Sequence, residues 1–104
     1  MTPVIIYCTC PDIVTARKIS RLLISQHMAA CVNQVPGISS IYEWEGKIEE
    51  NNEVLLLIKS TEERFDSIQK LVTEEHPYEL PELIAVPVSK GLPDYLDWIK
   101  QCTK

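Results

Sequence analysis

The sequence predicts a single α+β domain, in which strands and amphipathic helices follow one another in the order β-α-β-β-α-β-α. Short extended segments rich in Val and Ile are separated by segments whose apolar residues recur at helical spacing. Two consecutive extended segments, with no helix between them, are joined by Glu45-Gly46. No repeat, linker or low-complexity segment divides the 104 residues. Together these observations indicate the split βαβ pattern of ferredoxin-like folds with one additional helix at the C-terminal end.

The first strand and the first helix are expected to meet at a short turn. Residues 2–9 are rich in Val, Ile and Tyr and predict a buried strand. Cys10-Pro11-Asp12 is typical of a turn, and Asp12 is a good N-cap residue for the segment that follows. Apolar residues then recur at helical spacing from Thr15 to about Met28, which predicts an amphipathic helix there.

A long β-hairpin is expected in the middle of the chain. Alternate residues from Ile38 to Trp44 face opposite sides of an extended segment, and Pro36-Gly37 indicates a bend or bulge in its first part. After the turn, the return strand passes Ile48 and reaches residues 53–59, which are apolar enough for the centre of the sheet. Such long arms should project beyond the sheet, and pairing with identical subunits would cover their exposed edges and aromatic side chains.

A second helix is predicted after the hairpin. Ser60 is followed three residues later by Glu63, which is the spacing of a capping box, and apolar residues then recur at helical intervals. The helix is expected to end near Glu75, because Pro77 disfavours helical backbone at the residue before it.

The last strand and a final helix complete the predicted order. The strand is expected over residues 83–89, and Pro87 confines this part of the chain to an edge of the sheet. The final helix is expected to begin at Gly91-Leu92-Pro93, with Pro93 near its first position. Its predicted buried stripe consists of Leu92, Tyr95, Leu96 and Ile99.

Composition and charge exclude several classes of partner. The chain is 45% hydrophobic and 24% charged, as in ordinary globular proteins, and its net charge of −5 would repel phosphate backbones and anionic lipids. Arg17, Lys18 and Arg21 form the one close basic group, which we interpret as a solvated helix face. We therefore expect neither nucleic acid nor a membrane as a partner.

We expect a cytoplasmic protein with free thiols. No apolar run approaches the roughly 20 residues that span a bilayer, and the N-terminal residues lack the basic region and cleavage pattern of a signal peptide. A reducing compartment makes free thiols the expected state. The cysteines concerned are Cys8, Cys10, Cys31 and Cys102.

Two cysteines near the first strand are candidate metal ligands. Cys8 and Cys10 are two residues apart, so their thiols should point to one face and could together bind a soft ion such as Cu(I). The alternative is that they pack as small hydrophobic groups. The chain lacks the paired C-x-x-C or H-x-x-x-H spacings of structural zinc sites, and we expect His27 at the surface.

The tract 76–82 is the strongest functional pointer from the residues themselves. Its two prolines nearly fix the backbone, so Tyr78 and Glu82 would be held where they can bind a ligand or an adjacent subunit. His76 could bind a metal ion together with Glu75, or it could simply cap the carbonyl groups at the end of the helix. The alternative role for the whole tract is a stiff connector to the last strand.

The sequence predicts a binding protein and not an enzyme. It has no G-x-S-x-G motif, and its three glycines form no phosphate-binding loop of the G-x-G-x-x-G or P-loop kind. A Cys-His pair would still need a third group and an oxyanion hole, which no motif indicates.

Four separated motifs are together far more specific than any one of them alone. In chain order these are Cys8-Thr9-Cys10-Pro11-Asp12, Ala29-Ala30-Cys31-Val32-Asn33, Pro36 through Ile48, and His76 through Glu82. In order and spacing they resemble the divalent-cation tolerance proteins of the CutA family. The resemblance also takes in Glu53, residues 57–59 and residues 91–98, so it covers nearly the whole chain.

The resemblance implies a ferredoxin-like subunit in a homotrimer shaped like the PII signalling proteins, with long hairpins that wrap neighbouring subunits. It also implies a role in tolerance of copper and other divalent cations, without an obligatory cofactor. The implied metal ligands are Cys8, Glu75 and His76. Glu75 stands where a histidine is expected in the family, and a carboxylate is a harder ligand than an imidazole.

Our leading hypothesis is therefore a trimer that binds metal ions, and small ligands in clefts between its subunits. The residues expected to line these clefts are Trp44, Lys59, Tyr78 and Glu82. The alternative is a PII-like signalling or protein-anchoring scaffold that has no metal role in the cell.

Overall fold

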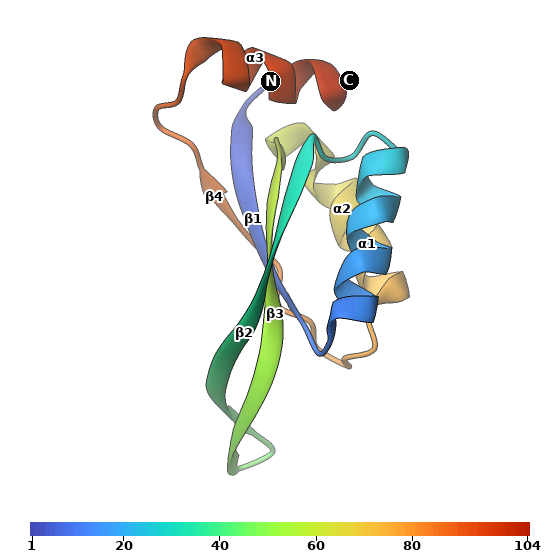
Figure 1. The fold of residues 1–104 in the computed structure, drawn as a ribbon, viewed down its shortest axis with the longest axis vertical. Coiled ribbons are helices and arrows are strands. Elements are labelled where there is room, and N and C mark those ends of the chain that lie inside the picture. The colour runs from blue at the N-terminus through green and yellow to red at the C-terminus, as the bar shows by residue number, and fades with distance from the viewer.

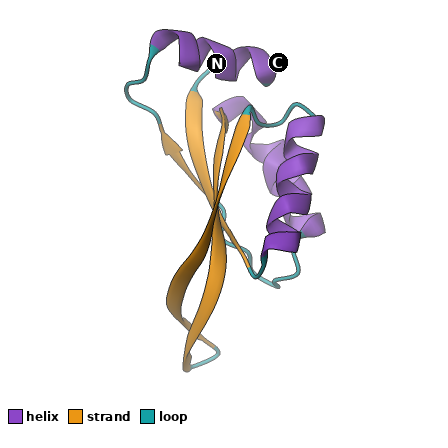
Figure 2. Ribbon diagram, in the orientation of Figure 1, coloured by secondary structure: helices purple, strands orange, loops and turns teal.

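The computed structural model describes all 104 residues and has the predicted order of elements (Figures 1 and 2). None of its helices combines the length and the apolar character needed to cross a membrane. The elements are β1 (Pro3–Cys10), α1 (Ile13–Ser25), β2 (Cys31–Trp44), β3 (Lys47–Thr61), α2 (Phe65–Glu75), β4 (Ile84–Pro87) and α3 (Pro93–Cys102).

One antiparallel sheet carries the fold, with strand order β2-β3-β1-β4. Helices α1 and α2 cover one of its faces, and α3 lies across the end near the N-terminus (Figure 1). Pro87 lies in β4 at the sheet edge, where its missing N–H leaves no gap in an inner ladder. The predicted ferredoxin-like α+β sandwich with a C-terminal helix is confirmed.

The core lies between the sheet and helices α1 and α2. Every second residue of β1 and β3 faces the helices, and Ile6 of β1 pairs directly with Ile58 of β3. Both side chains are fully buried, and each contributes roughly 1.5–3 kcal/mol through burial of apolar surface. Helices α1 and α2 contribute four large, fully buried side chains to this layer, namely Ile19, Leu23, Ile68 and Val72.

The hairpin of β2 and β3 extends well beyond the rest of the sheet. Pairing between β1 and β3 ends at Val54, so residues 47–53 of β3 pair with β2 alone (Figure 1). The predicted irregularity is confirmed: the β2–β3 register shifts by one residue between Val35 and Ile38. At the tip, Glu45 and Gly46 both have positive φ angles, 50° and 79°, as a two-residue turn between twisted strands requires.

The start of α2 differs from the prediction of a capping box. Ser60 still belongs to β3, where it pairs with Val4, and its hydroxyl donates to the carbonyl of Met28. The Glu63 carboxylate instead accepts the backbone N–H of Thr2 at 3.1 Å. Because Ser60 pairs within β3, it cannot act as the N-cap of a helix. Helix α2 instead follows a short 3₁₀ turn, Glu62–Arg64, and has no side-chain cap.

The predicted apolar stripe of α3 is largely not buried in the single chain. Ile99 is 2% exposed and Leu96 is half-buried, but Leu92 and Tyr95 are 72% and 39% exposed. The reason is position: α3 lies across the end of the sheet and not on its face (Figure 1). Ile99 is the one residue of the predicted stripe that is fully buried. The exposed part remains available to another surface.

Asp12 caps α1 as predicted, and we expect its contribution to stability to depend on pH. The backbone N–H of Thr15, 2.8 Å from Asp12 Oδ1, holds the pKa of the Asp12 carboxyl below its ordinary value. The carboxylate therefore stabilises the fold above that ordinary value, and the contribution is lost as the pH falls through the lowered pKa. In urea denaturation between about pH 7 and pH 2, Asp12→Asn should lose stability less steeply than the wild type, because an amide caps without titrating. Identical pH profiles would contradict this role.

Candidate functional site

The tract 76–82 runs from the end of α2 to β4 and is fastened to β1 by His76. The His76 backbone leaves the helical conformation (φ −85°, ψ 136°), as expected before Pro77, while its N–H still donates to Val72. Its imidazole Nδ1 accepts the N–H of Tyr78 at 3.1 Å, so Nε2 carries the proton and donates to the Thr9 carbonyl at 2.7 Å. His76 therefore serves as a helix cap and as the bridge between the tract and the strand.

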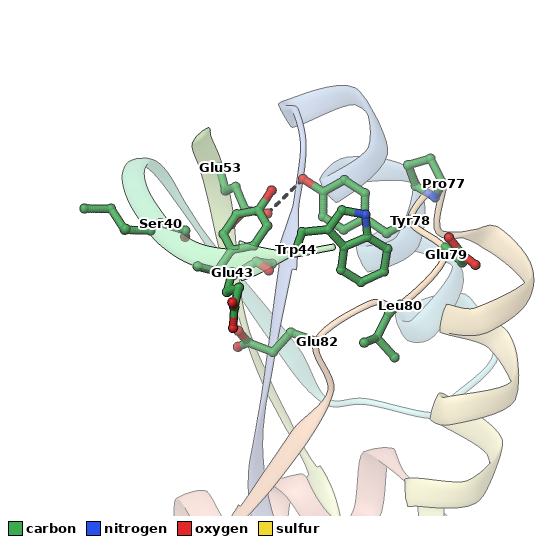
Figure 3. Close-up of a pocket in the computed structure, with 12 residues that line it drawn as sticks. Ser40, Glu43, Trp44, Glu53, Pro77, Tyr78, Glu79, Leu80 and Glu82 are labelled. Carbon is green, nitrogen blue, oxygen red and sulfur yellow. Dashed lines mark hydrogen bonds between the residues drawn. The ribbon is translucent and has the colours of Figure 1, made fainter. Parts of the chain in front are cut away.

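Tyr78 turns to a cleft that Glu53 of β3 also lines (Figure 3). The Tyr78 hydroxyl donates to Glu53 Oε2 at 2.8 Å, and the Glu53 side chain is 6% exposed. Burial, followed by this hydrogen bond, raises the pKa of Tyr78 well above its ordinary value. The phenol therefore stays protonated and holds the carboxylate in place.

Three of the four residues that were predicted to line clefts between subunits lie in this cleft, which one chain forms by itself. Its volume is about 730 Å³, and Trp44, Tyr78 and Glu82 are part of its wall (Figure 3). Lys59 is not: it lies in the inner part of β3 and donates to the side chain of Asn33 on β2. The outer hairpin and the rigid tract thus form this cleft within one chain.

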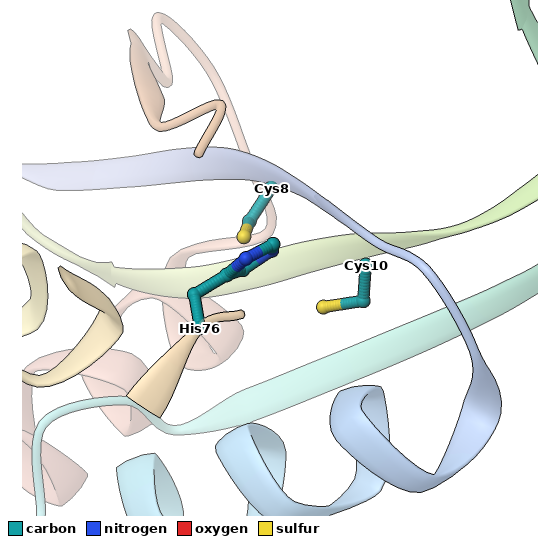
Figure 4. Close-up of side chains that lie close together, drawn as sticks. All are labelled: Cys8, Cys10 and His76. Atoms are coloured by element: carbon teal, nitrogen blue, oxygen red, sulfur yellow. The ribbon is translucent and has the colours of Figure 1, made fainter. Parts of the chain in front are cut away.

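Cys8, Cys10 and His76 form a cluster of side chains that lie close together (Figure 4). The two thiols project from the same side of β1, as the strand period predicts, and Thr9 between them faces the opposite way, into the cleft. One sulfur or nitrogen atom from each of the three side chains lies within 4.8 Å of the others, and all three side chains are buried.

The two thiols hold their protons unequally. A side-chain hydrogen bond with Cys10, followed by burial, raises the pKa of Cys8 far above its ordinary value, and the Cys8 thiol lies 3.9 Å from the Thr9 carbonyl, to which it donates. The hydrogen bond between the two thiols lowers the pKa of Cys10. Cys8 is therefore a thiol, and Cys10 is the sulfur that loses its proton first. A protonated, buried Cys8 is a poor nucleophile.

Glu75 does not join the cluster, although it precedes His76. Its carboxylate lies 2.9 Å from the ammonium group of Lys18 on α1. The two neighbours diverge because Glu75 is the last residue of α2, whereas His76 is already extended. Cys10 therefore stands with Cys8 and His76 in place of Glu75.

Sequence reasoning missed Glu53 as a wall of the cleft. The signal for it was a carboxylate at the start of the apolar run 53–59, because a charged residue is unusual beside a buried strand segment. His27, expected at the surface, is exposed.

Comparison with known proteins identifies relatives over almost the whole chain. Residues 4–102 match the family described as CutA1 divalent ion tolerance protein. The mouse protein CutA is 46% identical over 98 residues, which are 94% of this chain and 55% of the mouse protein. The chain thus spans about half the length of this curated relative.

Solved structures of the same kind share the fold. The divalent cation tolerance protein from Thermus thermophilus superimposes with a TM-score of 0.96 at 40% identity, covering 98% of this chain and 99% of the other. A protein from Archaeoglobus fulgidus, described as a periplasmic divalent cation tolerance protein, gives a TM-score of 0.95 at 36% identity and covers 98% and 99%.

We predict that His76→Ala lowers the free energy of unfolding by about 2–3 kcal/mol, because it removes two hydrogen bonds and leaves the buried Thr9 carbonyl with only the weak Cys8 thiol as a donor. Urea denaturation measures the change. The control is His27→Asn, since His27 is exposed and has a positive φ of 57°, which asparagine tolerates. The control should stay within about 0.5 kcal/mol of the wild type. Equal effects of the two substitutions would contradict the bridging role.

Proposed function

Because this chain belongs to the CutA1 divalent ion tolerance family, we propose that it binds a soft metal ion, copper above all, through Cys8, Cys10 and His76 in the response to divalent cations. The observation that carries the proposal is the gathering of two thiols and one imidazole within 4.8 Å in a buried position. The proposal concerns binding and not catalysis.

The donor set fits a soft or borderline ion. Thiolates favour Cu(I) and Zn²⁺, imidazole suits copper and zinc, and Mg²⁺ or Ca²⁺ would require oxygen ligands. Three protein donors satisfy a three-coordinate soft ion, whereas tetrahedral zinc would require a fourth ligand. The family resemblance pointed to Cys8, Glu75 and His76, and exchange of the carboxylate for the Cys10 sulfur makes the set softer.

Metal binding would be an exchange with existing hydrogen bonds. Neither imidazole nitrogen of His76 is free, because Nε2 donates to Thr9 and Nδ1 accepts from Tyr78. An ion at His76 would therefore displace one of these bonds, and ions at the thiols would displace protons. The site would thus select ions that bind sulfur and nitrogen strongly enough to offset the lost hydrogen bond and the displaced protons.

We also propose a homotrimer of PII-like shape as the working form. Edge strands β2 and β4 have unpaired backbone groups on their outer sides, and large apolar side chains along the hairpin and β4 are exposed. Contact between identical subunits would cover both. The exposed side chains include Ile41, Trp44, Ile48, Ile84 and Val86.

The projecting hairpin also favours a second candidate function, a signalling or anchoring scaffold. Tyr42 and Trp44 are exposed near the far end of the hairpin, where they could bind a protein partner. Such a scaffold would need no metal.

We propose the cytoplasm as the compartment. The four cysteines are unpaired in the fold, as thiols are in a reducing environment. The Archaeoglobus relative is described as periplasmic, so the family is not confined to one compartment.

We predict that the reduced protein binds one Cu(I) per chain in anaerobic competition with a coloured Cu(I) chelator. Cys8→Ser, Cys10→Ser and His76→Gln should each weaken binding by more than about 10–100-fold, because each removes a direct ligand. Cys102→Ser, which removes a thiol outside the cluster, should leave the affinity unchanged. Copper binding that survived all three cluster substitutions would favour the scaffold function.

We predict that analytical ultracentrifugation finds a mass three times that of the 11.9 kDa chain. The double variant Ile41→Asp/Trp44→Asp should sediment as a smaller species, because it places charges on apolar hairpin surface that contact would bury. Arg17→Asp on the exposed face of α1 is the control and should keep the mass of the wild type. A wild-type monomer at micromolar concentration would refute the trimer.

A further inference from the structure

We propose that the outer face of α1 is a docking surface for an acidic amphipathic helix of another protein. The surface is the basic stripe, which we define as Val14, Arg17, Arg21 and Ile24, all of them exposed. These residues follow one another at intervals of three, four and three, so their side chains form one line along the helix.

The basic stripe faces solvent, away from the core residues of the same helix. Ala16, Ile19 and Leu23 of α1 are fully buried in the core beneath the helix layer (Figure 1). The apolar side chains that contact between identical subunits would cover belong to the hairpin and to β4, and none of them lies on α1. The basic stripe therefore remains available to a different partner in the assembled protein.

The charge of α1 differs in sign from that of the whole chain. Three of the ten basic residues and none of the fifteen acidic residues lie on this helix, although the net charge of the chain is −5. The structure's one ion pair joins Lys18 to Glu75, so neither Arg17 nor Arg21 has a carboxylate partner. These two arginines are four residues apart on one helix face, where like charges repel each other. A partner with carboxylates would pair with both.

The two ends of the basic stripe are apolar. Val14 is 75% exposed and Ile24 is 41% exposed, and the two guanidinium groups lie between them in the line. Single exposed apolar residues are common, but here they are aligned with arginines. Arginine is weakly hydrated for a cation and is enriched in protein interfaces, whereas lysine is depleted there. The stripe thus has the composition of a contact surface.

The spacing of the basic stripe fits a helix as its occupant. The stripe spans about 15 Å, and rows of side chains three and four residues apart pack into the grooves of a second helix. The partner helix would place carboxylates at its centre and aliphatic side chains at both ends. Nucleic acid and anionic lipid fit less well, because two unpaired arginines give few contacts and the net charge of −5 repels both.

Fluorescence anisotropy of a labelled synthetic peptide with the full, assembled chain tests the proposal. The probe is an Ala-rich helix with the pattern Leu-x-x-Glu-x-x-x-Glu-x-x-Leu. We expect saturable binding that weakens as the salt concentration rises, because paired exposed charges are screened. A peptide with Gln in place of Glu, and a second with Ala in place of Leu, should each bind at least about tenfold more weakly.

Variants of the chain locate the surface. Arg17→Gln/Arg21→Gln should weaken peptide binding by at least about tenfold, because it removes both guanidinium partners. Lys90→Gln/Lys104→Gln makes the same change of net charge at exposed positions outside α1 and should keep the affinity of the wild type. Val14→Ser should weaken binding about fivefold through loss of apolar contact, and its 75% exposure means that folding is not at risk.

A photo-crosslinking experiment in the cells that make the chain tests for a natural partner. Val14 is replaced by p-benzoylphenylalanine in the full chain, and the product formed on irradiation is identified by mass spectrometry. We expect a product with another protein, joined through an acidic helical segment. Addition of Arg17→Gln/Arg21→Gln should abolish that product.

Several results would overturn the proposal. Failure of the peptide to bind, or equal affinities for the two double variants, would show that the basic stripe is a solvated surface. Photoproducts that contain only a second copy of the chain would make this face a contact between copies. Tighter binding to vesicles of phosphatidylcholine and phosphatidylglycerol than to the peptide would make it a membrane surface. None of these outcomes depends on copper binding or on the sedimented mass.

Discussion

The hydrogen bond from the His76 imidazole to the Thr9 carbonyl connects the parts of this molecule that carry its chemistry. It joins the tract after α2 to a central strand whose sequence positions are far away. On one side of that strand it places His76 against Cys8 and Cys10. On the other side it sets the path of the tract that brings Tyr78 to Glu53. Both candidate sites therefore depend on one buried contact.

The two sites have opposite chemical preferences although they share a strand. Sulfur and imidazole donors suit polarisable ions, while the cleft on the other side has carboxylates beside aromatic rings. The alternation of side chains along β1 produces this separation, because Cys8 and Cys10 face the helices and Thr9 faces the cleft.

Much of the fold was predictable from local signals. Periodicity gave the order of elements, and Glu45-Gly46 and Pro36-Gly37 gave the turn and the irregularity, because backbone conformation at these positions depends on the residues themselves. The capping box at Ser60 was wrong, since pairing with Val4 is a contact made across the sheet. Sequence spacing cannot show with which distant strand a residue will pair.

The site was predictable to a smaller degree. Cys8, Cys10 and His76 were candidate ligands by residue type and spacing, and the family resemblance also pointed to Cys8 and His76. That the three side chains meet is a consequence of tertiary structure. Glu75 was expected beside His76 at the cluster. Because α2 ends at Glu75 and the backbone of His76 is extended, the two side chains point in different directions, and Glu75 pairs with Lys18. The cleft residue Lys59 was likewise named without its position along β3, which puts it beside Asn33.

The register shift between Val35 and Ile38 decides which side chains line the cleft. Before it, Val35 of β2 pairs with Leu55 of β3, so that odd-numbered residues face odd-numbered partners; after it, Ile38 pairs with Glu53, and even-numbered residues face odd-numbered ones. One additional residue in β2 therefore reverses which residues of its outer part face each side of the hairpin. As a result, Tyr42 and Trp44 lie on the same side as Glu53. Loss of a single residue there would turn Tyr42 and Trp44 to the face opposite Glu53. The chemical character of the cleft therefore depends on the register of β2 as well as on the identity of its residues.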